Sequence, residues 1–418
     1  MNVDIIATST GAEGTLDRFQ QTALSYFDRE SHSVSGLVSD SNTIGSHASI
    51  AGTGFGLACN ALIAERGHKT RLETAAQTLS TLRFLTSTHG SSEHGFFYHF
   101  LDPITGQRAG RCEISTMDSA LLFAGAIAVS QYFDRESGIE REIRSLADSL
   151  YFSADWTWAS PRPPVISHGW TPEKGFLRYD WRGYNEALLL YILALGSPTH
   201  PVSTAAYDGW KTSYKWKSLY GHKLLYAGPL FIHQMAHAFI DFRGIADTYM
   251  RERGSDYFEN SRRATYVQRE YAVRNPRQFA RYGENSWGVS ASGGPADGKF
   301  FGYRARGVPY GPDDGTISPL ATAASLPFAP EIVLPALEHM QSISADDATW
   351  SSCFNATYSP DERTWTSSHS YAIDEGLAAL MIENHRSELI WRLLRKSPHI
   401  VRGLARAGFT GGWIDGAR

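Results

Sequence analysis

Residues 110–133 read GRCEISTMDSALLFAGAIAVSQYF, and the pattern in this stretch decides the fold class. Its apolar residues recur at helical spacing over a length that exceeds a typical strand, so the stretch predicts a helix over 116–133. Ser115 and Asp118 have the spacing of a capping box, which would satisfy free N–H groups of the first helical turn. Glu113 lies outside that box and is therefore more available to a ligand.

The same periodicity runs through most of the chain and predicts about a dozen helices. They are expected over 15–29, 47–65, 69–87, 116–133, 137–151, 184–195, 200–213, 229–252, 257–273, 330–341, 372–384 and 387–396. Long stretches rich in Gly, Pro and aromatic residues tend to follow alternate helices. Long loops of this kind usually carry function, so one end of the structure should hold a built-up site.

Three arrangements accommodate these helices: a superhelical array, a bundle with appended pieces, and a closed double ring. The chain has no fixed-period repeat, which argues against the array, and its alternate long loops favour the ring. We therefore predict an all-α fold, an (α/α)6 barrel of about twelve helices. We expect an N-terminal extension over 1–14 and a single domain over 15–418, because no linker or shift in composition marks another boundary.

Charge and cysteine content narrow the function classes. The 418 residues carry a formal charge of −4 from 39 basic and 43 acidic side chains without a long run of either sign, so nucleic acid is not an expected partner. No apolar run reaches the roughly 18 residues of a membrane span, so we expect no membrane partner either. Cys59, Cys112 and Cys353 lie far apart and suggest neither a disulfide framework nor a zinc site.

Further expectations concern assembly and compartment. We expect no metal or other cofactor, and a monomer. The compartment would be periplasmic or extracellular if a signal peptide was removed from the chain, and cytoplasmic otherwise.

Aromatic residues are abundant, with 11 Trp, 20 Tyr and 21 Phe, and such flat faces with polar edges suit stacking on sugar rings. We propose Tyr98, Trp181, Trp287 and Trp350 as sugar platforms, although about half of such aromatics commonly belong to a core.

Glu186 is the strongest catalytic candidate. Asn185 is a natural N-cap, which places Glu186 in the predicted first helical turn, where a carboxylate can have a purely structural role. However, Trp181 and Tyr184 belong to a dense group of aromatics just before it. An acid beside aromatics can have its pKa raised by desolvation, as a general acid requires.

Asp374 and Glu375 open a further predicted helix, in Ser368-His369-Ser370-Tyr371-Ala372-Ile373-Asp374-Glu375-Gly376. One of them could cap the helix while the other faces a cleft. Glycoside hydrolysis generally requires two carboxyl groups, and a closed helical ring can bring distant helix starts together. No G-x-S-x-G elbow, P-loop, H-E-x-x-H motif or dinucleotide fingerprint offers a competing chemistry.

His233 and His237 share one helix face at i, i+4 spacing and could form half of a metal site. Since no third ligand pattern accompanies them, a hydrogen-bonding or sugar-contacting role for His233 is the favoured interpretation.

Several strings resemble the glucoamylase-like family of bacterial β-1,2-glucan-active enzymes. They are His47-Ala48-Ser49-Ile50-Ala51-Gly52, Gly95-Phe96-Phe97-Tyr98-His99-Phe100, Gly183-Tyr184-Asn185-Glu186, Gly228-Pro229-Leu230-Phe231-Ile232-His233, Asp241-Phe242-Arg243-Gly244, Trp287-Gly288-Val289-Ser290-Ala291 and Ile373-Asp374-Glu375-Gly376. The resemblance covers roughly residues 15–410 in consistent order. The family that the chain resembles includes endo-β-1,2-glucanases of glycoside hydrolase family 144.

The resemblance implies an (α/α)6 fold and inverting hydrolysis of linear β-1,2-glucan to sophorooligosaccharides. It implies Glu186 as the general acid, with Glu113 and Asp118 lining the subsite of cleavage. The second carboxyl group is assigned to Asp374 or Glu113, and His233, Arg243 and Glu375 join the predicted substrate-binding set.

One departure from the family pattern concerns specificity. Where related enzymes show an aromatic-Asp-Ala-Phe-Asn string, this chain reads Ser351-Ser352-Cys353-Phe354-Asn355. The alternatives therefore include a transglycosylase or exo-acting glycosidase on the same scaffold, and a non-catalytic glycan-binding protein.

Overall fold

A computed structural model of the chain describes residues 11–295, 302–343, 352–358 and 364–417. Its helices are α1 (Ala12–Glu30), α2 (Ile50–Glu65), α3 (Arg71–Ser87), α4 (Thr116–Tyr132), α5 (Gly138–Phe152), α6 (Leu188–Gly196), α7 (Thr204–Lys211), α8 (Leu230–Gln234), η1 (Ala236–Ala238), α9 (Thr248–Arg251), α10 (Tyr257–Arg274), α11 (Pro319–Ala323), α12 (Pro330–Ser342), α13 (Ala372–Arg386), α14 (Leu389–Arg395), α15 (Pro398–Arg406) and α16 (Gly412–Asp415). Its strands are β1 (Ala48–Ser49), β2 (Ser92–Glu93), β3 (Phe96–Phe97), β4 (Phe100–Leu101), β5 (Ile114–Ser115), β6 (Gly169–Thr171), β7 (Gly175–Phe176), β8 (Trp216–Leu219), β9 (His222–Leu225), β10 (Phe354–Asn355) and β11 (Trp365–Thr366). The described chain is thus mainly helical, with strands confined to short antiparallel pairs and one three-stranded sheet.

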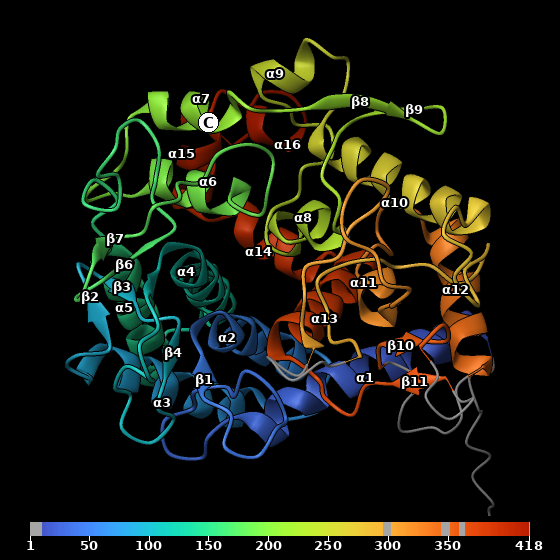
Figure 1. Ribbon diagram of the computed structural model, residues 1–418. Coiled ribbons are helices and arrows are strands. Elements are labelled where there is room, and N and C mark those ends of the chain that lie inside the picture. The colour runs from blue at the N-terminus through green and yellow to red at the C-terminus, as the bar shows by residue number, and fades with distance from the viewer. Residues whose placement is uncertain (1–10, 296–301, 344–351, 359–363, 418) are drawn as a thin grey trace, which may run out of the picture.

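The helices divide into an inner and an outer set according to their apolar patterns. Every residue of α2 from Ile50 to Ile63 is buried, and α6 is buried along its whole length. A helix that is apolar on all sides must lie inside, whereas α5 buries one stripe and leaves the other face polar. In Figure 1, α2, α4 and α13 accordingly lie around the middle of the molecule, while α1, α3, α5, α10 and α12 lie outside them.

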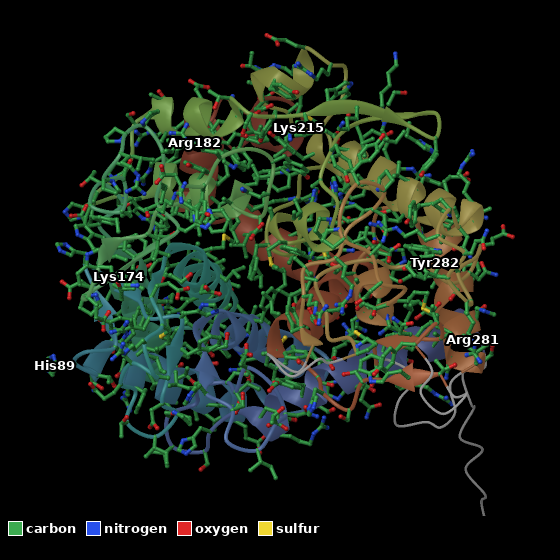
Figure 2. The ribbon with its side chains drawn as sticks, viewed as in Figure 1. His89, Lys174, Arg182, Lys215, Arg281 and Tyr282 are labelled. Atoms are coloured by element: carbon green, nitrogen blue, oxygen red, sulfur yellow. The ribbon has the colours of Figure 1, made fainter. Side chains whose placement is uncertain are left out.

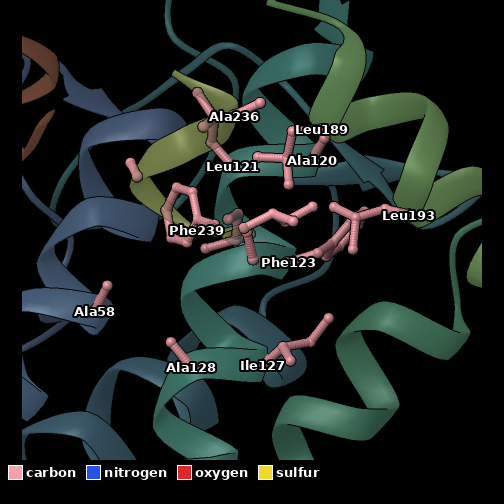
Figure 3. Packing of buried hydrophobic residues seen from close by; sticks show 14 of the residues in the cluster. Ala58, Ala120, Leu121, Phe123, Ile127, Ala128, Leu189, Leu193, Ala236 and Phe239 are labelled. Carbon is pink, nitrogen blue, oxygen red and sulfur yellow. The ribbon is translucent and has the colours of Figure 1, made fainter. Parts of the chain in front are cut away.

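The main core is formed between these inner helices. Figure 3 shows Leu189 and Leu193 of α6 beside Phe123 of α4, while Phe239 lies on the other side near Leu121. All five side chains are at most 2% exposed. This packing fixes the start of α6 relative to α4.

The axes of α2 and α4 approach so closely that glycines are required at their contact. A Cβ atom added to Gly125 would lie 2.0 Å from the carbonyl oxygen of Gly54, and one added to Gly54 would lie 2.5 Å from the carbonyl oxygen of Leu121. Backbone atoms cannot yield as a flexible side chain can, so these two positions set the distance between the two helices.

We expect Gly125→Ala to destabilise the fold by about 1–3 kcal/mol or more, the usual cost of overpacking a tight core. The free energy of unfolding in urea measures this effect. Gly138→Ala in α5 is the matched control, because nothing lies within 4 Å of its added Cβ, and it should change stability by less than about 0.5 kcal/mol. An equal effect of the two substitutions would contradict the close approach.

Short strand pairs gather several helix starts at one end of the molecule. β1 pairs with β4, and β5 pairs with β6. The two pairs are linked by a hydrogen bond of 2.8 Å from His99 N–H to the Glu113 carbonyl. Ala372 N–H at the start of α13 donates to the Asp40 carbonyl at 2.9 Å. The N-terminal ends of α2, α4 and α13 therefore lie near one another.

Most predicted helices are confirmed to within a few residues, and the largest deviation has a physical cause. The predicted helix 229–252 is wrong: it divides into α8, η1 and α9, because the 239–247 segment buries Asp241 and Asp247, and Asp247 caps α9 at Met250 N–H. The predicted helix 184–195 begins only at Leu188. The short helices α11, α15 and α16 were not predicted, and α1 begins at Ala12, within the expected 1–14 extension.

Within the described ranges, no helix combines the length and apolar character needed to cross a membrane.

Candidate active site

A cavity of about 350 Å³ opens where these helix starts meet. Its polar lining comes from separate parts of the chain: His99, Glu113, Ser115, Asp118, His168, Glu186, Tyr303 and Asp374. Its apolar walls include Met117, Leu121, Trp181, Phe231, Met235 and Leu377. Four of the carboxylates named from the sequence, Glu113, Asp118, Glu186 and Asp374, are thus brought to one cavity.

Glu186 lies in the turn immediately before α6. Asn185 does not cap α6 itself, because its Oδ1 accepts from Ala187 N–H at 3.2 Å and from Trp210 Nε1–H at 3.1 Å. The sequence predicted Glu186 in the first helical turn, but the residue precedes the helix. Its carboxyl group faces the cavity. Burial, with a smaller contribution from the nearby Asp118 carboxylate, raises the pKa of Glu186 to about 7.

Asp374 lies in the first turn of α13 and lines the same cavity. Its Oδ1 accepts a hydrogen bond of 3.2 Å from the Tyr303 hydroxyl. Burial raises the pKa of Asp374 to about 8 against the lowering effect of the hydrogen bond from Tyr303, and the nearby Glu375 and Asp40 carboxylates make smaller raising contributions. Asp374 and Glu186 are therefore carboxyl groups that can hold a proton near neutral pH.

Glu113 and Asp118 are held by His99. The Nδ1 atom of His99 lies 2.9 Å from Glu113 Oε1, and its Nε2 atom lies 3.7 Å from Asp118 Oδ2. Burial lowers the pKa of His99, but Asp118, Glu113 and Asp40 together raise it to about 9. The hydrogen bond from His99 lowers the pKa of Glu113, so the imidazolium keeps Glu113 ionised.

The predicted capping box forms only in part. The Ser115 hydroxyl accepts from Asp118 N–H at 3.3 Å and also donates to the Asp118 carboxylate. Because no bond returns from that carboxylate to the Ser115 backbone, Asp118 is left facing His99 and the cavity.

We expect His99→Gln to lower the melting temperature at pH 6 by about 1–3 °C, the shift expected for one hydrogen-bonded charge in a chain of this size. Since the folded pKa of His99 is raised above 6.5, its stabilisation is complete below pH 6.5 and is lost as the pH rises through about 9. The difference from the wild type should therefore shrink between these pH values. His89→Gln, at an exposed histidine on the periphery (Figure 2), is the control and should show no such trend.

Trp181 forms part of the cavity wall, as expected of a sugar platform. Its Nε1–H donates to the Thr116 hydroxyl at 3.0 Å, and its ring stacks on His168 with centroids 3.9 Å apart. Both contacts fix the orientation of the indole ring.

The structure corrects several other predicted binding residues. His233 is 2% exposed, is hydrogen-bonded to the Ala227 carbonyl at 3.2 Å, and has a pKa lowered to about 4 by burial. Trp287 is fully buried in a second core cluster, and Glu375 is 2% exposed. None of the three lines the cavity, so their position contradicts a direct sugar contact. Tertiary packing turns these three side chains into the core, and the sequence around each does not reveal this direction.

Tyr98 and Arg243 also lie outside the cavity lining. Tyr98 is 8% exposed, with the Arg108 guanidinium 4.9 Å from its ring centroid. Arg243 is bound to Asp241 at 2.9 Å and covers the ring of Trp391 at 4.5 Å. These side chains are engaged by the protein itself. Trp350 lies outside the described residues.

Sequence reasoning assigned no role to three groups around the cavity. His99 occurs within a string quoted for the family resemblance, but nothing in that string indicates its two carboxylate partners. Tyr303 follows a Gly-rich stretch of sequence. Asp40 lies between α1 and α2, and its backbone carbonyl accepts a hydrogen bond from Ala372 N–H at the start of α13. Burial raises the pKa of Asp40 to about 6. No local signal marks Tyr303 or Asp40.

The fold and the site define a mainly helical protein in which helix starts surround a carboxyl-lined cavity. The model of the family described as "Glycoamylase: Putative glucoamylase" matches residues 178–398. The chain belongs to this family.

Known proteins similar to the chain extend this finding. An exo beta-1,2-glucooligosaccharide sophorohydrolase (non-reducing end) of Parabacteroides distasonis is 25% identical over 433 residues, covering 94% of this chain, which spans 58% of that protein's length. The structure of a "putative glucoamylase" from Bacteroides uniformis has 31% identity and a TM-score of 0.88 over 97% of this chain and 99% of that one. An endo-beta-1,2-glucanase from Chitinophaga pinensis, in complex with sophorotriose and glucose, has 26% identity and a TM-score of 0.86 over 97% and 100% of the two chains.

Proposed function

We propose that this chain is a glycoside hydrolase acting on β-1,2-linked glucan or its oligosaccharides. The observation that carries the proposal is that Glu186 and Asp374, two carboxyl groups with raised pKa, line one cavity beside the Trp181 ring. Hydrolysis of a glycosidic bond requires such a pair. The names of the similar proteins from Parabacteroides distasonis and Chitinophaga pinensis support the β-1,2 linkage.

The proposed architecture is an (α/α)6 barrel forming a single domain over 15–418. The division into apolar inner helices and amphipathic outer helices supports it. Similarity to endo-beta-1,2-glucanase over almost the whole chain also supports it. The proposed protein is a monomer.

In this proposal Glu186 is the general acid. Its carboxyl group is protonated below about pH 7, so it can donate that proton to the glycosidic oxygen as the bond to the anomeric carbon breaks. The apolar walls from Leu121, Met235 and Leu377 limit hydration of the carboxyl group and keep its charged form unfavourable.

Asp374 is the proposed general base of an inverting mechanism. A base works best when its pKa is near the working pH, so Asp374 is a stronger proton acceptor than Glu113, whose pKa is lowered by His99. Asp374 would take a proton from a water molecule, which attacks the anomeric carbon from the face opposite the leaving oxygen. Inversion requires about 6.5–9.5 Å between the two carboxyl groups to leave room for that water.

Glu113 and Asp118 serve substrate binding in this proposal. Because His99 keeps Glu113 ionised, that carboxylate accepts hydrogen bonds from sugar hydroxyl groups and does not donate a proton. Trp181 offers an apolar face to the same sugar.

The substrate is tested by incubating the wild-type protein with β-1,2-, β-1,3- and cyclic β-1,2-glucans and following the products by NMR. We expect cleavage of linear β-1,2-glucan and release of the α-anomer first. Early β-anomer would show retention and overturn the inverting mechanism, and cleavage of β-1,3-glucan alone would overturn the linkage.

An exo-acting hydrolase is a second candidate, because the similar Parabacteroides protein is named as an exo-acting sophorohydrolase and the cavity is small. The two modes differ in their early products. Exo action releases one small product from the start, whereas endo action produces a ladder of oligosaccharides.

We expect kcat/KM to be maximal near neutral pH. The base must be ionised, so activity falls on the acid side as Asp374 gains its proton, and the acid must be protonated, so activity falls on the alkaline side as Glu186 loses its proton. With values of about 8 and about 7, the two groups titrate as a pair and the maximum lies between them. A pH profile of kcat/KM measures this, and an optimum at or below about pH 5 would contradict the raised values.

A further inference from the structure

One wall of the cavity is formed by the segment from Leu177 to Trp181, and both of these residues line the cavity. Tyr179 lies between them and is 66% exposed, one of the most exposed aromatic side chains among the described residues. An aromatic ring of this kind at the edge of a cavity has no role in the core. The segment belongs to the side of the molecule on which Figure 2 labels Lys174 and Arg182.

The backbone of this segment contains a β-bulge that directs Tyr179 outward. Leu177 N–H donates to the Gly169 carbonyl at 2.8 Å, while Asp180 pairs with Ser167. Arg178 and Tyr179 therefore both lie opposite the single residue His168. A bulge re-aims the side chain at its extra residue, and such bulges often lie beside active sites.

A continuous series of rings connects the cavity wall with Tyr179. The Trp181 ring, held by its hydrogen bond to Thr116, stacks on His168 at 3.9 Å with an interplanar angle of 23°. The centroid of the Tyr179 ring follows 6.2 Å from that of His168. The three neighbouring rings thus connect the cavity wall at Trp181 with the solvent-exposed ring of Tyr179.

The cavity is too small to hold a long oligosaccharide, so the remaining glucose units of such a substrate must bind outside it. Its volume of about 350 Å³ is at the lower end of the range for small-molecule sites, roughly 300–1,000 Å³. A glucan chain that fills it must therefore continue over the rim. Sugar rings stack on exposed aromatic faces, and Tyr179 offers such a face at the rim.

We propose that Tyr179 is an outer platform on which a glucose unit outside the cavity stacks, so that the protein favours oligosaccharides long enough to reach it. This inference rests on the proposed function, since it takes the substrate to be a β-1,2-glucan. Tyr179 determines chain-length preference and takes no part in bond cleavage.

The test compares Tyr179→Ala, Tyr179→Phe and the wild type on sophorooligosaccharides of increasing length. We expect Tyr179→Ala to leave kcat/KM on the shortest cleaved substrate within twofold and to lower it about fivefold or more on longer ones, mainly through KM, as loss of one aromatic contact implies. Tyr179→Phe keeps the ring face and should behave like the wild type. Tyr310→Ala is the matched control, because Tyr310 is 65% exposed, packs against Tyr226 and does not line the cavity.

Calorimetric binding to the same oligosaccharide series separates the two proposals, because it requires no turnover. If the wild type binds the series but hydrolyses none of it, the proposed function fails. The platform is then supported if Tyr179→Ala weakens binding only of the longer chains, and it is overturned otherwise. If the wild type is active and Tyr179→Ala loses the same factor at every length, or loses nothing, the platform is overturned alone. Absence of any binding overturns both.

Discussion

Glu186→Gln is expected to lower kcat on β-1,2-glucan by about 10²–10⁴-fold, the usual contribution of general acid–base catalysis. Glutamine has nearly the shape of the protonated acid but has no proton to donate to the leaving oxygen. The Glu186 side chain lines the cavity, so its neutral isostere should leave the fold and glucan binding intact.

An activated substrate distinguishes the acid from any other role of Glu186. An aryl β-glycoside with a good leaving group needs little protonation, so Glu186→Gln should retain much more activity on it than on glucan. Glu284→Gln, at an exposed residue paired with Arg269, is the control and should match the wild type on both substrates. Unchanged activity of Glu186→Gln on glucan would remove this residue from the mechanism. Tight glucan binding by a wild type that releases no reducing ends would instead indicate a glycan-binding protein.

Asp374→Asn is expected to cause a loss of similar size, about 10²–10⁴-fold in kcat, because asparagine cannot accept the proton of the attacking water. Asparagine can still accept the hydrogen bond from the Tyr303 hydroxyl, so the start of α13 should keep its structure. Sodium azide needs no base to attack the anomeric carbon, so it should restore turnover to this variant and form a glycosyl azide of inverted configuration.

Glu113→Gln is the comparison that decides between the two candidates for the base. If Glu113 serves binding, its variant should raise KM more than it lowers kcat and should gain nothing from azide. The opposite result, rescue of Glu113→Gln and none of Asp374→Asn, would transfer the role of base to Glu113. A melting temperature for each variant separates loss of function from loss of fold.

Predicted and observed helices agree where local spacing decides the structure and differ where distant contacts decide it. Periodicity predicted α2, α4, α5 and α10 to within a few residues, because long apolar patterns depend on neighbours three and four positions away. The same pattern failed over 229–252, where buried Asp241 and Asp247 bind groups that lie elsewhere in the chain or cap a new helix. The spacing of apolar residues within 229–252 does not reveal such partners.

The candidate site shows the same division. Their places at predicted helix starts, together with the family resemblance, selected Glu113, Asp118, Glu186 and Asp374, all of which line the cavity. The residue types alone did not separate them from Glu375, Trp287 and His233, which are buried in the core. Only the direction in which the fold turns each side chain distinguishes the two groups.

The sequence by itself thus determined most of the long helices, which helices are apolar on all sides, and which acids stand beside helix starts. Only the tertiary structure decided that His99 lies between Glu113 and Asp118, that Tyr303 binds Asp374, and that Glu186 faces an apolar wall. The physical reason is that the two properties depend on interactions of different range along the chain. Helix formation depends on hydrogen bonds and side chains a few residues apart, whereas the pKa of a carboxyl group depends on burial and charge within a few ångströms in space, whatever the separation along the chain.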